Sequence, residues 1–274
     1  MKRLLNILLC LLAALLFCGA AAPQTPTLEV YFFQAGKADA ILLTTENGAV
    51  LIDAGEKGFG KEIAAYCAER GIGKLDYLIL THFDKDHVGG AAKVLRELPV
   101  GQVLQSGYEK DNKEFQNYLK ALRKAGLEPV TVREELCFTL DGVDFTVDPP
   151  RLERYADSPS NNSSLIVTVS CGGCRLLFPG DAESLRLMEW LENEPAPCAF
   201  IKMPHHGEWN SALLPLLEQL QPDSAVITSS EKEPESPKTR ELLARFGVDC
   251  FYTREAPVLL ACDGKAVILR YAAD

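Results

Sequence analysis

Residues 78–90 read Leu-Ile-Leu-Thr-His-Phe-Asp-Lys-Asp-His-Val-Gly-Gly, and the interpretation of the whole chain depends on them. An apolar run typical of a buried strand comes first. His82, Asp84, Asp86 and His87 follow it within six residues. Imidazole nitrogens and carboxylate oxygens at this spacing meet at one point if the loop curls, and they suit Zn²⁺, Mn²⁺ or Fe²⁺. The alternative is a solvated acidic loop between a strand and a helix.

The other two of the four histidines, His205 and His206, follow a second apolar run at residues 199–203. A third apolar run, at residues 175–178, leads to Gly180 and Asp181. Side chains at the carboxyl ends of strands are common places for function in α/β folds. Because all four histidines fall after strands, a metal site is favoured over the acidic loop. We expect one or two divalent metal ions, Zn²⁺ or Mn²⁺.

The stretch from Thr81 to His87 resembles the H-x-H-x-D-H motif of the metallo-β-lactamase superfamily, with Asp84 where the motif has its second histidine. That aspartate is typical of the ComEC-type branch, the hydrolase domain of DNA-uptake proteins and of related secreted hydrolases. Residues 204–207 are similar to the P-H-H-G signature of the superfamily. The resemblance covers residues 28–271. It implies an α/β fold, the four-layer αββα sandwich with two mixed sheets.

The resemblance also implies a set of metal ligands, namely His82, Asp84, Asp86, His87, Asp181 and His206. By this resemblance Asp181 is the aspartate that bridges two metals. Asp86 would also accept a proton, and His205 would face the substrate as a hydrogen-bond donor or acid. Which of His205 and His206 is the ligand stays open. Metals held in this way lower the pKa of a bound water, which then attacks a phosphoryl or carbonyl centre.

Most superfamily members carry a third histidine for the first metal near residues 161–164. This chain has Asn-Asn-Ser-Ser there, similar to the N-x-S-L signature of the ComEC-type branch. An amide oxygen binds metal more weakly than imidazole, so occupancy by one metal is a second possibility. The residues expected to support the site or contact the substrate are Asp39, Asn161, Asn162, Ser163, Ser164 and Ser229. Asp53, at the end of a strand, is expected to support the site without binding metal.

Composition limits the partners and the location. The 274 residues are 47% hydrophobic, enough for a single domain over residues 23–274. A formal net charge of −10 argues against a stable complex with nucleic acid. In residues 1–22, two basic residues precede an apolar run and then small residues, as in an export signal. We expect a secreted or cell-surface protein that contacts the membrane only if this segment remains as an anchor.

Local patterns predict most of the secondary structure. Apolar spacing indicates helices at residues 60–70, 91–98, 112–125, 184–193, 213–220 and 239–246. Short turns indicate hairpins at Asn47-Gly48, Asp141-Gly142 and Asp263-Gly264. Cys171 and Cys174 flank a Gly-Gly pair, which favours one more hairpin turn over a zinc or redox motif. Outside residues 1–22 the cysteines are odd in number, which argues against a complete disulfide framework.

Together these features predict an exported metal-dependent hydrolase, most simply a phosphodiesterase or nuclease. Its substrate would be nucleic acid or a phosphorylated cell-surface component. Two departures from the ComEC-type branch count against a nuclease: Gln34 replaces an aspartate, and residues 235–237 read Glu-Ser-Pro where the branch has G-H-P. The alternatives are a metallohydrolase acting on a lactam, ester or thioester, and a non-catalytic surface module that binds metal.

Overall fold

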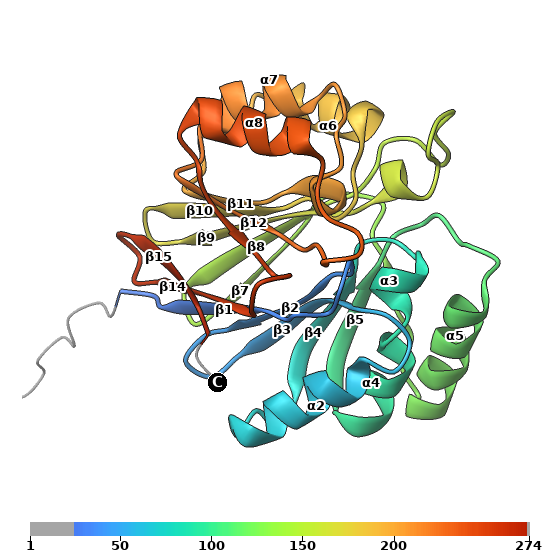
Figure 1. Ribbon diagram of the computed structural model, residues 1–274. Helices are drawn as coiled ribbons and strands as arrows, with labels where there is room; N and C mark the ends of the chain where they lie inside the picture. The colour runs from blue at the N-terminus through green and yellow to red at the C-terminus, as the bar shows by residue number, and fades with distance from the viewer. Residues whose placement is uncertain (1–24, 273–274) are drawn as a thin grey trace, which may run out of the picture.

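The computed structural model describes residues 25–272, so the expected export segment at residues 1–22 lies outside the described residues. Two mixed β-sheets face each other, and helices cover the outer side of each (Figure 1). Helices α6, α7 and α8 lie over one sheet, and α2, α4 and α5 lie under the other (Figure 1). The expected four-layer αββα sandwich is confirmed.

The first sheet has eight strands and includes both ends of the described chain. In spatial order they are β15 (Val267–Tyr271), β14 (Val258–Cys262), β1 (Leu28–Phe32), β2 (Ala40–Thr44), β3 (Ala49–Ala54), β4 (Leu75–Leu80), β5 (Val100–Gln105) and β6 (Val130–Thr131). The strands from β15 to β3 pair antiparallel, and those from β3 to β6 pair parallel.

The second sheet has seven strands and, like the first, consists of an antiparallel part and a parallel part. In spatial order they are β13 (Asp249–Tyr252), β12 (Ser224–Ile227), β11 (Phe200–Lys202), β10 (Cys174–Phe178), β9 (Ile166–Cys171), β8 (Val143–Asp148) and β7 (Leu136–Leu140). The strands from β7 to β10 pair antiparallel, and those from β10 to β13 pair parallel. Hairpins at the turns expected from the sequence join β2 to β3, β7 to β8, β9 to β10 and β14 to β15.

The helices match the expected segments within a few residues. They are α2 (Gly60–Glu69), α4 (Ala91–Glu97), α5 (Lys113–Ala125), α6 (Ser184–Leu191), α7 (Leu213–Leu220) and α8 (Pro237–Phe246). The pattern did not predict the one-turn helix α3 (Lys85–Val88) or the 3-10 turns η1 (Asn161–Ser163) and η2 (Pro204–Gly207). No helix within residues 25–272 is long and apolar enough to cross a membrane.

Alternation along the strands separates the apolar layers. Leu28, Val30 and Phe32 of β1 point into the core between the two sheets, whereas Tyr31 and Phe33 pack toward the helices. This period of two is what a strand with both faces covered requires. A third cluster fills the space between the second sheet and α6, α7 and α8. All seven cysteines of the described residues are unpaired, including Cys171 and Cys174.

The parallel strands of both sheets end at the same edge of the sandwich. In the first sheet, β3, β4 and β5 lead into the loops after residues 54, 80 and 105. In the second, β10, β11 and β12 lead into the loops after residues 178, 202 and 227. Carboxyl ends of parallel strands are where α/β folds place their sites. The fold therefore brings the histidine-bearing loops of both sheets together.

Gly90 is required by the packing of this edge. A Cβ atom on Gly90 would lie 2.0 Å from the carbonyl oxygen of Ala54, which is backbone and cannot move away freely. We expect Gly90→Ala to lower the free energy of unfolding by roughly 1–3 kcal/mol or more, measured by urea denaturation. A Cβ on Gly73 would meet no atom within 4 Å. Gly73→Ala is the matched control, with an expected change within about 0.5 kcal/mol. Equal stability of the two variants would contradict this account.

Candidate metal centre

Four side chains from both sheets converge at the shared edge. Asp86 and His87 belong to α3, which follows β4, while Asp181 follows β10 and His206 follows β11. Each offers one ligand atom, and these atoms all lie within 4.8 Å of one another. We call Asp86, His87, Asp181 and His206 the inner group. Three of the four side chains are buried, and Asp86 is partly exposed.

Asp181 lies at the centre of the histidines. Its Oδ2 atom is 3.2 Å from His87 Nε2 and 3.3 Å from His206 Nε2. The same oxygen is 4.0 Å from His82 Nε2 and 3.9 Å from His205 Nε2. All four histidines of the chain thus present the same ring nitrogen to one carboxylate oxygen. This is the arrangement expected of Asp181 from the sequence, although its role as a bridge between two metals stays a prediction.

Hydrogen bonds at Nδ1 orient the two histidines of the inner group. His87 Nδ1 lies 2.8 Å from Asp53 Oδ2, and His206 Nδ1 lies 3.0 Å from the carbonyl oxygen of Thr228. A carboxylate and a carbonyl can only accept, so both histidines donate from Nδ1. In the neutral tautomer, Nε2 then carries the lone pair that a metal requires. Asp53 thus orients His87, while its expected role without direct metal binding stays a prediction.

Unpartnered buried atoms show that the residues fit a metal ion. The Nε2 atoms of His82, His87 and His206 and the Oδ1 atom of Asp181 are buried and have no hydrogen-bond partner. Leaving such atoms unpaired costs free energy, because buried polar groups normally find a partner. Imidazole and carboxylate are donors for Zn²⁺ and Mn²⁺. The donor set, its burial and its unpaired atoms all agree with a divalent metal site, without specifying the metal.

A buried lysine stands behind the inner group. The Lys202 side chain is fully buried at the end of β11, and its ammonium is ion-paired with Asp39 and lies 3.6 Å from Asp181 Oδ1. It also donates a hydrogen bond to the carbonyl of Gly180, at 3.2 Å. Asp39 in turn accepts a 2.6 Å hydrogen bond from the hydroxyl of Thr228. Asp39 also lies 3.5 Å from His206 Nδ1 and 3.9 Å from His87 Nδ1, so it stands directly behind the inner group.

These charges shift the titration of the site. Burial acts to raise the pKa of Asp181, but the charges of His206 and His87 outweigh it and hold the pKa well below its usual value. Burial acts to lower the pKa of His206, yet Asp181 and Asp39 raise it to about 9. Burial, with the charge of His87, lowers the pKa of His82 to about 4. Protons and a divalent cation therefore compete for the same atoms.

His82 and Asp84, which we call the outer pair, lie to one side of the inner group. His82 Nε2 is 3.9 Å from Asp84 Oδ1, so the two face each other. Asp84 Oδ1 already accepts hydrogen bonds from Lys110 Nζ, at 2.6 Å, and from the hydroxyl of Ser160. The role of Asp84 as a metal ligand stays a prediction, and its present partners are cationic and neutral donors.

The four residues of the Asn-Asn-Ser-Ser segment, 161–164, make two kinds of contact. Asn162 and Ser163 are buried and hydrogen-bonded to backbone atoms of the surrounding loops. Ser164 Oγ lies 3.4 Å from His82 Nδ1. Asn161 alone reaches the open side, where its amide nitrogen is 3.4 Å from His205 Nε2. The structure therefore brings Asn161 and Ser164 to histidines and directs the other two away from them.

His205 and His206 point in different directions because the backbone turns sharply after β11. Both have positive φ, 46° and 52°, a left-handed conformation that is uncommon for histidine. His206 is buried in the inner group, whereas His205 is 27% exposed and its Nδ1 lies 3.3 Å from Glu183 Oε1. The expected supporting residue Ser229 lies elsewhere: it is buried and donates to Glu235 Oε2 at 2.8 Å. The geometry therefore favours His206 over His205 as the ligand.

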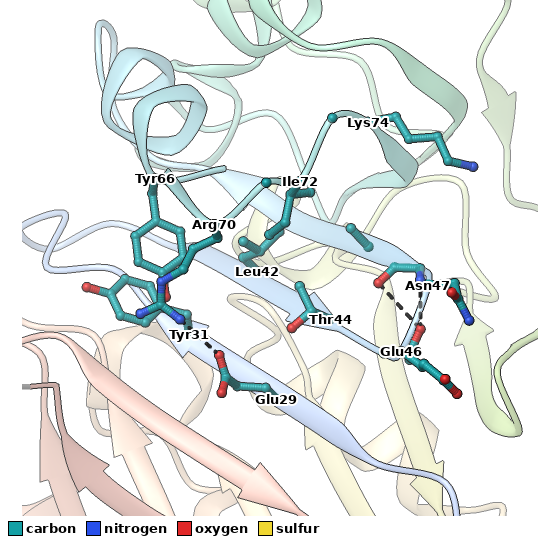
Figure 2. A pocket seen from close by; sticks show the side chains of 15 residues that line it. Glu29, Tyr31, Leu42, Thr44, Glu46, Asn47, Tyr66, Arg70, Ile72 and Lys74 are labelled. Carbon is teal, nitrogen blue, oxygen red and sulfur yellow. Dashed lines mark hydrogen bonds and ion pairs between the residues drawn. The ribbon is translucent and has the colours of Figure 1, made fainter. Parts of the chain in front are cut away.

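A separate cavity lies on the helix side of the first sheet. It has a volume of about 500 Å³ and is lined by residues of β1, β2 and α2, including Glu29, Tyr66 and Arg70 (Figure 2). Arg70 is paired with Glu29 at 3.5 Å and lies over the ring of Tyr66 at 4.8 Å. No residue of the inner group or the outer pair lines this cavity. It is therefore distinct from the metal centre.

Four residues around the site were not predicted: Lys202, Lys110, Thr228 and Thr81, which donates to Asp53 from its backbone N–H and its hydroxyl. The sequence did carry a signal for Lys202. A lysine within the apolar run 199–203 would be buried with the strand, and a buried lysine needs a partner. Thr81 and Thr228 immediately follow β4 and β12, so their positions pointed to the site edge although their type did not. Lys110 had no signal, since it lies in a polar loop between β5 and α5.

Comparison with known proteins agrees with the fold. A profile described as the metallo-beta-lactamase superfamily matches residues 34–229. ComE operon protein 3 of Bacillus subtilis is 29% identical over 223 residues, 74% of this chain and 28% of that protein. Recombination protein 2 of Haemophilus influenzae is 26% identical over 240 residues, 84% of this chain and 28% of that protein. The chain thus spans about 28% of the length of these curated relatives.

Solved structures support the fold alone, since the identities are low. The metallo-beta-lactamase fold protein YhfI from Bacillus subtilis aligns with a TM-score of 0.54 and 11% identity, over 82% of this chain and 96% of that one. A protein from Parabacteroides distasonis aligns with a TM-score of 0.52 and 13% identity, over 82% of this chain and 92% of that one. With the profile covering most of the sequence and the inner group in place, this chain belongs to the metallo-β-lactamase superfamily, and it is a distant homologue of ComEC-type proteins.

Proposed function

We propose that this metal-dependent hydrolase of the metallo-β-lactamase fold is a phosphodiesterase. The inner group carries the proposal, because two carboxylates and two imidazoles lie within 4.8 Å of one another and buried ring nitrogens are unpaired. A donor set that is half carboxylate suits Mn²⁺ as well as Zn²⁺. Two relatives are named Competence protein ComA and Recombination protein 2, which supports nucleic acid as the source of the diester.

The residues of the inner group would hold the ion, and Asp53 and Thr228 would keep the two imidazoles aligned. A divalent ion bound there supplies Lewis-acid catalysis and a water activated near neutral pH. Asp86 Oδ2 lies 3.3 Å from His206 Nε2 and its side chain is 21% exposed, so it reaches both the ion site and solvent. We assign Asp86 as proton acceptor.

His205 faces the open side of the site and is placed to give a proton to the leaving group. Its Nδ1 lies against Glu183 and its Nε2 lies 3.4 Å from the Asn161 amide nitrogen. The carboxylate of Glu183 orients the ring through Nδ1, and Nε2 would turn to the substrate once the leaving group displaces the Asn161 amide. These contacts favour His205 as the substrate-facing histidine.

A second cavity, which shares the Asn-Asn-Ser-Ser segment with the site, is our candidate for binding the rest of the substrate. A cavity of about 380 Å³ includes Ser163 and begins at residues 107–109, just before Lys110. Its lining contains Arg133 and Arg151 together with two glutamates. We assign it to the portion of the diester beyond the scissile phosphate. With a net charge of −10, a short or single diester is favoured over duplex DNA.

The direct test is hydrolysis of bis(p-nitrophenyl) phosphate and of linear DNA by the purified protein after chelation and resupply of Zn²⁺ or Mn²⁺. We expect turnover of the small diester that needs metal, because the activated water requires the ion. An Asp86→Ala/His87→Ala variant is the control and should lose this metal-dependent turnover. Metal-dependent turnover of carbonyl esters alone would contradict the proposal, and a protein that binds no metal would contradict hydrolase chemistry altogether.

We also propose that the protein is exported from the cytoplasm. The basic and apolar layout of residues 1–22 supports export, and with it a substrate outside the cytoplasm, either nucleic acid or a phosphorylated surface component.

A further inference from the structure

The surroundings of Asp84 distinguish it from the carboxylates of the inner group. Its Oδ1 atom accepts both from Lys110 Nζ, at 2.6 Å, and from the Ser160 hydroxyl. A charge-assisted hydrogen bond of this kind is among the stronger contacts a carboxylate makes. The same Oδ1 atom is the one that faces His82 Nε2, at 3.9 Å, and after accepting two hydrogen bonds it has little capacity left for a metal ion shared with His82.

Lys110 is held at this position by its loop. Two residues later, Asn112 donates from its amide to the carbonyl of Phe83, at 2.8 Å, next to Asp84. The same side chain accepts from the backbone N–H of Phe115 at 2.7 Å and so caps α5. The loop is therefore tied at one point both to the metal-binding stretch and to a helix, which fixes the ammonium near Asp84.

The Asn-Ser-Ser residues 162–164 add no donor for an ion at the outer pair, so such an ion would depend on His82, Asp84 and the shared Asp181. Asn162 uses its Oδ1 atom to accept from the backbone N–H of Arg186, at 3.0 Å, and its amide to donate to Asp157. Ser163 donates to the carbonyl of Pro159 at 2.7 Å. Ser164 accepts from the backbone N–H of Asp181 at 3.3 Å. His82 Nε2 is a buried atom on this side without a hydrogen-bond partner.

We propose that Lys110 supplies the second positive charge of the site: its ammonium lies against Asp84 where a second ion would otherwise bind, and the protein holds one divalent ion in the inner group. The Lys110 side chain is 38% exposed and that of Asp84 is 26% exposed, so the pair faces solvent and an incoming anion. Resting on the proposed function, this inference names the residue that meets the negative phosphate.

The test is the number of Mn²⁺ ions per chain, measured by equilibrium dialysis and elemental mass spectrometry. We expect one ion in the wild-type protein and two in Lys110→Ala, because that change frees Asp84 to bind metal together with His82 and Asp181. Lys113→Ala removes an exposed lysine at the start of α5 and is the matched control, with one ion expected. Two ions in the wild type, or one ion in both the wild type and Lys110→Ala, would overturn the proposal.

A second readout follows the substrate. At a Mn²⁺ concentration that fills one site, Lys110→Ala should raise KM for bis(p-nitrophenyl) phosphate about tenfold, as expected for the loss of one charged contact, while Lys110→Arg restores it. An unchanged KM would refute the contact with substrate. The number of bound ions is measured without turnover. If the ion numbers are as expected but no diester is hydrolysed, the proposed phosphodiesterase activity is refuted and the one-ion site is not.

Discussion

His206→Ala is expected to remove the bound metal ion and to lower metal-dependent hydrolysis by roughly a thousandfold or more. The reason is geometric. His206 is buried, its Nδ1 is committed to Thr228, and its unpaired Nε2 lies 3.3 Å from both Asp86 Oδ2 and Asp181 Oδ2. Metal content by elemental analysis and the rate with saturating Mn²⁺ measure the two effects.

His205→Ala is the matched variant, since it changes the neighbouring histidine. His205 is partly exposed and is oriented by Glu183, so the variant should keep its metal. Its kcat should fall by roughly a hundredfold to ten-thousandfold, the range for loss of a general acid. If His205→Ala lost the metal and His206→Ala kept it, the two histidines would have exchanged roles, and the assignment made from the geometry would be wrong.

Lys202→Met is expected to have the largest effect on stability. The change removes the cation from a fully buried ion pair and leaves the Asp39 carboxylate without it. Burial acts to raise the pKa of Asp39, and the charge of Lys202, aided by the nearby histidines, is what holds it below the usual value. Breaking one partner of a buried pair costs roughly 3–5 kcal/mol. Urea denaturation measures the loss.

The double variant Asp39→Asn/Lys202→Met separates the lost charge from lost packing. The amide oxygen of the new side chain could still accept the hydrogen bond from Thr228, and no uncompensated charge would remain. We expect the double variant to recover a large part of the lost stability, which a double-mutant cycle quantifies. Lys61→Met, on the exposed face of α2, is the control and should change stability by less than about 0.5 kcal/mol. Equal losses in the single and double variants would show that packing, not charge, is the cause.

Much of the sandwich could be predicted because local patterns carry it. The hairpin turns at Asn47-Gly48 and Asp141-Gly142 and the helical spacing around Phe115 have physical requirements that few other structures meet. The scarcity of histidine then pointed to the site. The four histidines follow two apolar strands, β4 in the first sheet and β11 in the second. Each strand pairs parallel to its neighbours, and the two sheets face each other, so their histidines meet at one edge.

The surroundings of the site could not be predicted in the same way. The strands β5, β6 and β13 were not predicted because their residues lack a clear alternating pattern, and tertiary pairing decides them. Lys110 reaches Asp84 across 26 residues through a loop whose path depends on how α5 packs. Likewise Asp53 meets His87 from a different strand. Contacts of this kind depend on the assembled fold.

The site is divided between the two sheets, and this has a consequence for synthesis of the chain. Asp86 and His87 emerge from the ribosome long before Asp181 and His206, and the Thr228 carbonyl that orients His206 follows later still. Residues 82–87 alone hold only part of the donor set. The complete site therefore cannot exist until the chain has been translated past β12 and its two sheets have packed together. A divalent ion would therefore find its full donor set only late in the synthesis of the chain.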